Sequence, residues 1–204
     1  GVLESTSESA YDTTHSGIGV NGYSIVSGWG ELRANACIVS YMNGYKDPRR
    51  SAYFTQSTSG LSGEYVGVRS GSTEIPVPSN YSIYSNLMIT TGRSLPQPVM
   101  YAAEAAFLRA EGELKGWDMK GDAETFYKQG VRLSFAEFNV SGADEYLADN
   151  ISVPGNYTDS SHPADNYTNQ SSITIQWDEG ASDAEKLERV LTQKWIACYP
   201  DPMN

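Results

Sequence analysis

The chain has 204 residues, enough for one large domain or two small ones, and its 39% hydrophobic content suits a folded protein. Its formal net charge of −11 at pH 7 repels phosphate backbones, so we expect no nucleic-acid partner. The sequence also lacks the long apolar run of about eighteen residues that a membrane-spanning helix requires.

A first helix is predicted after an irregular lead-in. Residues 1–27 are rich in Ser, Thr and Gly and show little hydrophobic periodicity. Residues 28–43 place apolar side chains on one helical face. The members of this face are Leu32, Ala36, Val39 and Met42. Pro48 disfavours helical backbone in the residue before it, so the helix ends before the Asp-Pro-Arg sequence at 47–49.

A long polar stretch follows, from Ser51 to Gln97. It is rich in Ser, Gly, Tyr, Pro and Asn, with short extended segments near 64–68 and 74–78. Loops of this length are uncommon inside compact domains and usually carry function. We therefore expect binding residues in this stretch.

Two amphipathic helices are predicted next, over residues 98–116 and 122–138. Pro98 suits a first helical position, and Asp122 suits an N-cap. The apolar stripes comprise Val99, Ala103, Phe107, Ala110 and Leu114 in one helix and Phe126, Gly130, Val131, Phe135 and Phe138 in the other. The pair forms a helical hairpin of the tetratricopeptide type. One such unit cannot bury its own apolar face, so it needs further partner surface.

A second polar stretch, Asn139 to Gly180, precedes the last predicted helix at 183–198. Ser182 and Glu185 match a capping box at its start. The side expected to be buried carries Leu187, Val190, Leu191 and Trp195. We assign Trp117 and Trp195 to the core. The predicted fold is thus mainly α, with a tetratricopeptide-like hairpin, further helices, long irregular loops and short β segments, in a single domain over 1–204.

Catalytic and metal-binding patterns are weak. His15 and His162 are the only histidines, and both lie in polar loops. The glycine pattern at 17–22 lacks the preceding apolar strand of a dinucleotide-binding fold, so it predicts a loop. Cys37 and Cys198 are interpreted as two buried thiols, with a disulfide as the alternative. We expect no enzyme activity, no metal site and no cofactor.

Tyrosines are frequent in the two polar stretches. They include Tyr53, Tyr65, Tyr81, Tyr84, Tyr157 and Tyr167. An aromatic ring with a polar handle suits the apolar face and hydroxyl rim of a sugar. The alternative for each ring is that it only fastens its loop to the helices.

Several segments, taken in order, resemble the SusD/RagB family of surface glycan-binding lipoproteins. The segments are DPRR with YF at 47–54, GEYVGVRSG at 63–71, PVMYAAEAAFLRAEGELKGW at 98–117, GDAETFYKQGVRLSFAEF at 121–138 and EKLERVLTQKWIACYP at 185–200. Family members are usually more than twice as long, with a signal peptide, a lipid-bearing N-terminal cysteine and further helices. The resemblance therefore implies that this chain is a fragment of a longer protein.

The resemblance further implies a lipid-anchored protein of the outer-membrane surface. Its lipid would be carried by an N-terminal part that this chain does not include. Such a protein captures an oligosaccharide and passes it to a SusC-like TonB-dependent transporter. The candidate ligand-binding residues are Tyr65, Arg69, Tyr81, Tyr84 and Trp29.

Two other functions remain open. The chain could be a helical-repeat docking module for the transporter with no small ligand of its own. It could also be a carbohydrate-active enzyme, which would need two carboxylates within roughly 5–10 Å of each other in a cleft. Several acidic residues, such as Glu104, Glu111 and Glu188, fall instead on predicted helix faces, where solvent exposure explains them.

Overall fold

The structure is a computed structural model that describes residues 2–12, 32–58, 64–73, 76–83 and 97–200. It divides into two compact units. Unit 1 comprises residues 1–12, 98–151 and 173–204, and unit 2 comprises residues 13–97 and 152–172. Each unit thus draws on segments that are far apart in sequence, and the single-domain assignment for 1–204 stays a prediction.

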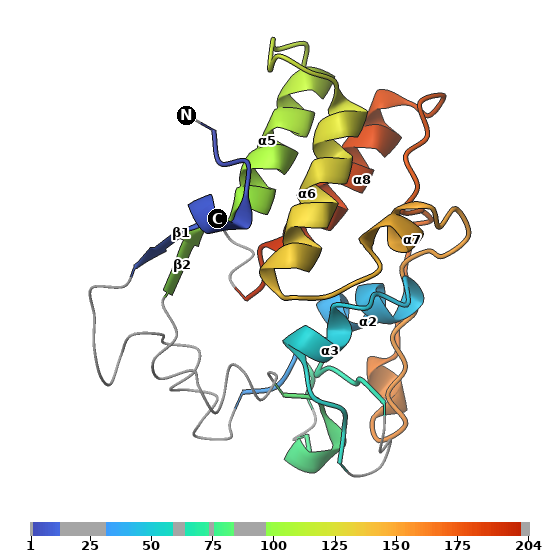
Figure 1. The fold of residues 1–204 in the computed structure, drawn as a ribbon. Helices are drawn as coiled ribbons and strands as arrows, with labels where there is room; N and C mark the ends of the chain where they lie inside the picture. The colour runs from blue at the N-terminus through green and yellow to red at the C-terminus, as the bar shows by residue number, and fades with distance from the viewer. Residues whose placement is uncertain (1, 13–31, 59–63, 74–75, 84–96, 201–204) are drawn as a thin grey trace. The chain divides into compact units, whose positions relative to one another are not determined.

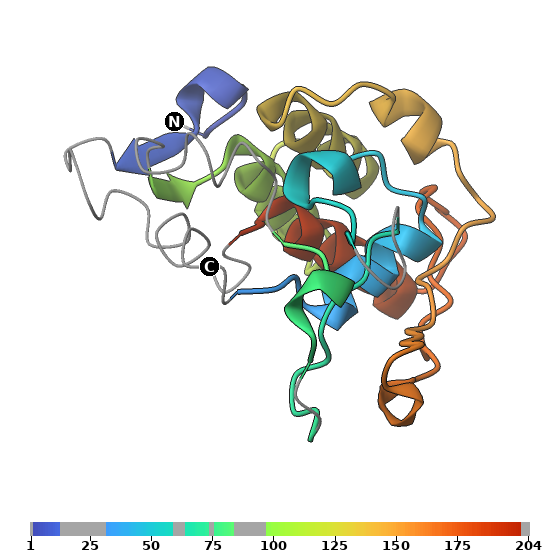
Figure 2. The same cartoon turned by 90° about the horizontal axis from the view of Figure 1, so that it is seen from below.

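Three helices form the body of unit 1. They are α5 (Ala102–Leu114), α6 (Ala123–Glu137) and α8 (Asp183–Ala197), which lie side by side in Figure 1. The view in Figure 2 looks nearly along their axes. Phe107, Tyr127 and Val131 are fully buried. A Cβ at Gly130 would lie 2.8 Å from the Phe107 ring, so glycine permits the close approach of α5 and α6. The predicted mainly α fold with a helical hairpin is confirmed.

Helix α5 begins later than the predicted residue 98. Strand β2 (Gln97–Met100) pairs with β1 (Ala10–Asp12), and α5 starts only after Tyr101. Val99 is therefore a strand residue, and its side chain is 55% exposed rather than part of the helical stripe. The local periodicity gave no sign of this pairing, because the partner strand lies near the start of the chain.

Polar side chains account for part of the buried face of α8. Arg189 and Gln193 are buried, whereas the predicted core residue Leu191 is 41% exposed. Arg189 Nε donates to the Thr174 carbonyl at 3.0 Å, and Gln193 Nε2 donates to the Tyr146 hydroxyl at 3.0 Å. These partners compensate the desolvation of Gln193 and part of that of Arg189, whose Nη1 is buried without a hydrogen-bond partner in the described part.

The two tryptophans assigned to the core have different surroundings. Trp117 lies between α5 and α6 and is 58% exposed, so its core assignment is wrong. The Lys115 ammonium lies over its ring, 5.7 Å from the ring centroid. Trp195 on α8 is half-buried.

The other short elements of unit 1 are α7 (Ala143–Leu147) and the 3₁₀ turn η1 (Thr6–Glu8). Segment 173–177 is held against α6 by its backbone and by one tryptophan. The Tyr127 hydroxyl donates to the Ile175 carbonyl at 2.6 Å, and the rings of Tyr127 and Trp177 are 5.4 Å apart. This contact brings a long loop back to the helical bundle.

Unit 2 contains α2 (Ala36–Gly44), α3 (Arg50–Tyr53) and the 3₁₀ turns η2 (Pro78–Asn80) and η4 (Pro163–Asp165). Helix α2 is shorter than the predicted 28–43. The backbone of Asn35 is extended, so 32–35 precede the helix, and residues 28–31 lie outside the described part.

A buried ion pair stabilises the turn after α2. Arg49 Nε and Nη2 donate to the two Asp47 carboxylate oxygens at 3.0 and 2.6 Å, and both side chains are fully buried. The bidentate geometry compensates the desolvation of both charges. The Asp-Pro-Arg sequence therefore has a structural role in this turn.

Cys37 and Cys198 do not form a disulfide in the described part of the chain. Cys198 is buried, as predicted, whereas Cys37 is exposed on the first turn of α2. Its position follows from the start of α2 at Ala36, which turns this side chain away from the buried face.

Candidate functional site

The first turn of α2 forms one wall of a pocket in unit 2. Asn35 is its N-cap, because the Asn35 side-chain oxygen accepts from the Cys37 backbone N–H at 2.8 Å. The Asn35 side-chain nitrogen donates to Ser70 Oγ at 2.9 Å. Asn35 therefore fixes the start of the helix and ties it to a second segment.

Residues 66–70 form the second wall. The Ala36 N–H donates to the Val68 carbonyl at 2.9 Å, and the Val68 N–H donates to the Ala34 carbonyl at 2.8 Å. A Cβ at Gly67 would lie 2.6 Å from backbone atoms of Ala36, so this approach requires glycine. The pairing places Arg69 and Ser70 beside the start of α2.

Residues 167–170 form the third wall. Tyr157 and Tyr167 pair through two backbone hydrogen bonds of 3.0 and 3.2 Å, and their rings stack with centroids 5.5 Å apart. The Asn169 N–H donates to Asn156 Oδ1 at 2.9 Å. These contacts place residues 167–170 of the second polar stretch at the pocket.

Asp159 anchors the loop that leads to this third wall. Its carboxylate is buried and accepts the hydroxyls of Tyr81 and Tyr157 at 2.7 and 3.1 Å. It also accepts the N–H groups of Ser161 and His162 at 2.8 and 3.0 Å. The same Tyr157 hydroxyl lies 2.7 Å from the Gly67 carbonyl. The network thus connects the second and third walls.

The charge of this network depends on Asp159. Burial alone raises the pKa of its carboxyl group, but the hydrogen bonds from Tyr81, His162, Ser161 and Tyr157 outweigh it and lower the pKa below the ordinary value. Burial, together with the neighbouring carboxylate, raises the pKa of the Tyr81 and Tyr157 phenols. At neutral pH the network therefore holds a carboxylate and two protonated phenols.

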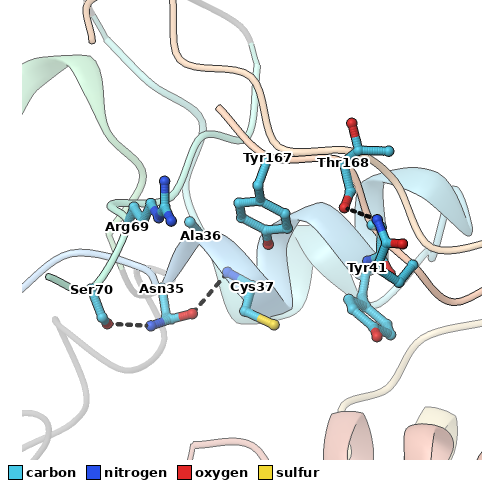
Figure 3. Close-up of a pocket in the computed structure, with 10 residues that line it drawn as sticks. Asn35, Ala36, Cys37, Tyr41, Arg69, Ser70, Tyr167 and Thr168 are labelled. Atoms are coloured by element: carbon cyan, nitrogen blue, oxygen red, sulfur yellow. Dashed lines mark hydrogen bonds between the residues drawn. The ribbon is translucent and has the colours of Figure 1, made fainter. Parts of the chain in front are cut away.

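The three walls enclose a cavity of about 430 Å³. Figure 3 shows Tyr167 above α2 beside Cys37, with Arg69 next to the Asn35–Ser70 pair. The lining residues are Asn35, Ala36, Cys37, Tyr41, Arg69, Ser70, Tyr167, Thr168, Asn169 and Gln170. Arg69 is the single charged residue among them, and none of these described lining residues is a carboxylate.

Several groups in the lining keep hydrogen-bonding capacity. Arg69 Nη1 donates to the Asp165 carbonyl at 2.9 Å, and its Nε and Nη2 have no partner within the described residues. Gln170 uses only its amide nitrogen, toward the Thr168 carbonyl at 3.0 Å. The Tyr167 hydroxyl is buried without a hydrogen-bond partner in the described part. Polar groups of this kind can bind hydroxyl or charged groups of a ligand.

The Cys37 thiol at the pocket edge is a poor nucleophile. Desolvation raises its pKa, an effect that the nearby Tyr167 hydroxyl only partly opposes. The thiol is therefore protonated at neutral pH.

The structure brings one of the five sequence-predicted site residues to this cavity, namely Arg69. Tyr65 lies under the Arg50 guanidinium, 5.4 Å from its ring centroid, and is not part of the lining. Tyr81 is buried in the Asp159 network, where it donates to Asp159 and contacts His162 Nδ1 at 2.8 Å. Tyr84 and Trp29 lie outside the described residues. The set as a whole stays a prediction.

Within the described residues, no group of three or more His, Cys, Asp or Glu side chains could hold a metal ion. A search of the same residues for helices long and apolar enough to cross a membrane finds none.

A family model described as SusD-like, the SusD and RagB outer-membrane lipoproteins, matches residues 1–204. The chain belongs to this family. The predicted family and the outer-membrane localisation are therefore confirmed. A search of the curated proteins finds no match.

Solved structures of SusD-like proteins resemble the chain closely. A SusD-like protein from Bacteroides thetaiotaomicron is 69% identical, with a TM-score of 0.90, and the match covers 100% of this chain and 43% of that protein. A chitin-binding SusD homologue from Flavobacterium johnsoniae is 36% identical, with a TM-score of 0.87, over 99% of this chain and 41% of that protein. The chain thus spans less than half the length of these SusD-like relatives.

Most lining residues of the pocket in this SusD-like chain were not among the ligand-binding residues predicted from the sequence. Tyr41 was inside a predicted helix, and Asn169 and Gln170 were in a polar stretch without periodicity. Tyr167 was noted only as one of several loop tyrosines. The signal that could have found the site was the run of Tyr, Thr, Asn and Gln at 167–170, which combines a ring with amides.

Proposed function

We propose that the chain is part of a cell-surface protein that captures oligosaccharides in the pocket at the start of α2. The SusD-like family and its chitin-binding relative support a carbohydrate ligand. On this proposal the protein passes the bound oligosaccharide to a SusC-like TonB-dependent transporter.

The observation that carries the proposal is the composition of the pocket. Two tyrosine rings, Tyr41 and Tyr167, stand with the Gln170 amide and the Arg69 guanidinium around one cavity. Rings bind the apolar face of a sugar, and amide and guanidinium groups bind its hydroxyls. The described lining residues include no carboxylate pair for glycosidic bond cleavage, which favours binding over hydrolysis.

The test compares two tyrosine variants of the full-length protein. We expect Tyr41→Ala to lower the affinity for a bound oligosaccharide by about 1–2 kcal/mol, or roughly five- to thirtyfold, because it removes a ring from the pocket. Alanine is a good helix former, so α2 should remain folded. The measurement is titration calorimetry against chito-oligosaccharides and the hits of a glycan array.

Tyr65→Ala is the matched control, because Tyr65 is a half-buried tyrosine of unit 2 that does not line the pocket. It should leave the affinity unchanged. A loss of affinity in Tyr65→Ala but not in Tyr41→Ala would move the site to the residues predicted from the sequence. If the wild-type protein binds no oligosaccharide, the proposed function is wrong.

A further inference from the structure

Arg69 differs from the other polar groups of the pocket because most of its donors are available. Its Nη1 is fixed by the Asp165 backbone carbonyl at 2.9 Å, and the guanidinium carbon lies 5.8 Å from the centroid of the Tyr167 ring. No carboxylate among the described residues pairs with Arg69. The side chain is therefore oriented by neutral groups and keeps its full charge for a ligand.

The two available donors of Arg69, Nε and Nη2, point along the same edge of the guanidinium plane. This edge matches the two oxygens of a carboxylate. Arg49 uses it in this same chain, where Nε and Nη2 bind Asp47 at 3.0 and 2.6 Å. Arg69 presents the same edge to the cavity, and no carboxylate among the described residues pairs with it.

The charge of the surroundings supports an anionic ligand group at this point. The chain carries a net charge of −11, yet no acidic residue of the described part lines the cavity. A bound carboxylate would thus meet one cation and no lining anion. A neutral sugar would instead leave the Arg69 edge to water.

We propose that the pocket binds the carboxylate of an acidic sugar, such as a uronate or a sialate, through Nε and Nη2 of Arg69. The inference rests on the proposed oligosaccharide-binding role of the pocket and names the class of sugar that it prefers. Tyr41 and Tyr167 then contact the sugar rings, and Gln170 contacts their hydroxyls.

The experiment uses the full-length protein and pairs of oligosaccharides. Each uronate- or sialate-bearing oligosaccharide is presented beside its methyl ester, with sulfated oligosaccharides and neutral chitohexaose on the same array, and dissociation constants of the hits are then measured in solution. We expect the acid form to bind about tenfold or more tightly than its ester, because hydrogen bonds to a charged group are worth more than neutral ones.

Three variants separate the guanidinium edge from charge in general. Arg69→Ala should bring the ratio of acid to ester affinity close to one. Arg69→Lys should restore only a small part of the preference, because an ammonium is a point charge without a bidentate edge. Arg132→Ala removes an equal charge from an exposed position on α6 that does not line the pocket, and it should leave the ratio unchanged.

The outcomes distinguish this inference from the proposed function. If neutral oligosaccharides bind but acid and ester bind equally, the acidic-sugar assignment is wrong and oligosaccharide capture stands. A preference for sulfated over carboxylated sugars would likewise overturn the carboxylate assignment. If neither acidic nor neutral oligosaccharides bind, both proposals fail.

Discussion

Asp159 is the residue on which the geometry of the candidate site most depends. Its buried carboxylate accepts four hydrogen bonds, from two tyrosines of different segments and from two backbone N–H groups of its own loop. A carboxylate accepts at four positions, so few other side chains could hold these donors together. The sequence marked Tyr81 and Tyr157 as loop tyrosines, but it could not show that both meet one acid, because that depends on the fold of unit 2.

The lowered pKa of Asp159 predicts a pH-dependent contribution to stability. A carboxylate with a folded-state pKa below its unfolded value of about 3.9 stabilises the fold above that pH, and this contribution is lost as the pH falls through the folded pKa. Asp159→Asn puts an NH₂ group where donors converge, so it should lower the free energy of unfolding by about 1–3 kcal/mol at pH 7.

The measurement is urea unfolding of wild type and variant at pH 7 and again near pH 3. The difference between the two proteins should shrink at the lower pH, because protonation of this carboxyl group, first in the unfolded and then in the folded state, removes the contribution of its charge. Asp118→Asn, at an exposed loop position, is the control and should change little at either pH. An equal deficit of Asp159→Asn at both pH values would contradict the role of the charge.

At the scale of elements, the sequence predicts helices better than it predicts their ends and loops. The four main helices all occur, but only α6 and α8 begin where the sequence predicts, with Asp122 and Ser182 as observed N-caps. The start of α5 was missed because β2 pairs with a strand far back in the sequence. The pocket was missed for the same reason, since three segments that are separate in sequence build it.

A substitution at Gly67 tests whether the close approach of residues 66–70 to the start of α2 positions the second wall of the pocket. An alanine Cβ there would lie 2.6 Å from backbone atoms of Ala36, which cannot move as a flexible side chain could. We expect Gly67→Ala to destabilise the protein by about 1–3 kcal/mol, as overpacking does. It should also weaken oligosaccharide binding, because Arg69 and Ser70 follow directly.

Thermal unfolding and oligosaccharide titration measure the two effects of Gly67→Ala. Gly180→Ala is the matched control, because its Cβ would meet only the Asp178 carboxylate oxygen, at 3.3 Å. This oxygen belongs to a side chain that can move, so the control should behave like wild type. A stable Gly67→Ala protein with normal binding would show that the segment tolerates displacement.

At the scale of the whole molecule, the chain spans less than half of the length of its SusD-like relatives, and its described residues include the pocket at the start of α2. Binding an oligosaccharide and docking to a transporter require different kinds of surface. A shallow sugar site depends on a few side chains, whereas docking to a transporter takes an interface that buries on the order of 1,000 Å² or more. Single truncations in the pocket should therefore affect capture alone.

We expect the full-length protein with Tyr41→Ala and Arg69→Ala to lose oligosaccharide binding and still co-purify with its transporter from detergent-solubilised outer membranes. The readouts are the bound oligosaccharide and the transporter recovered per mole of protein, with Tyr65→Ala as the control for both. Retained transporter with lost sugar would establish that capture and docking are separable. Loss of the transporter as well would contradict this separation, because it would place the pocket within the docking surface.

A wild-type protein that recovers the transporter but no oligosaccharide would instead support the docking-module alternative. In that alternative the helices of unit 1 bind the transporter, and the pocket has no ligand of its own.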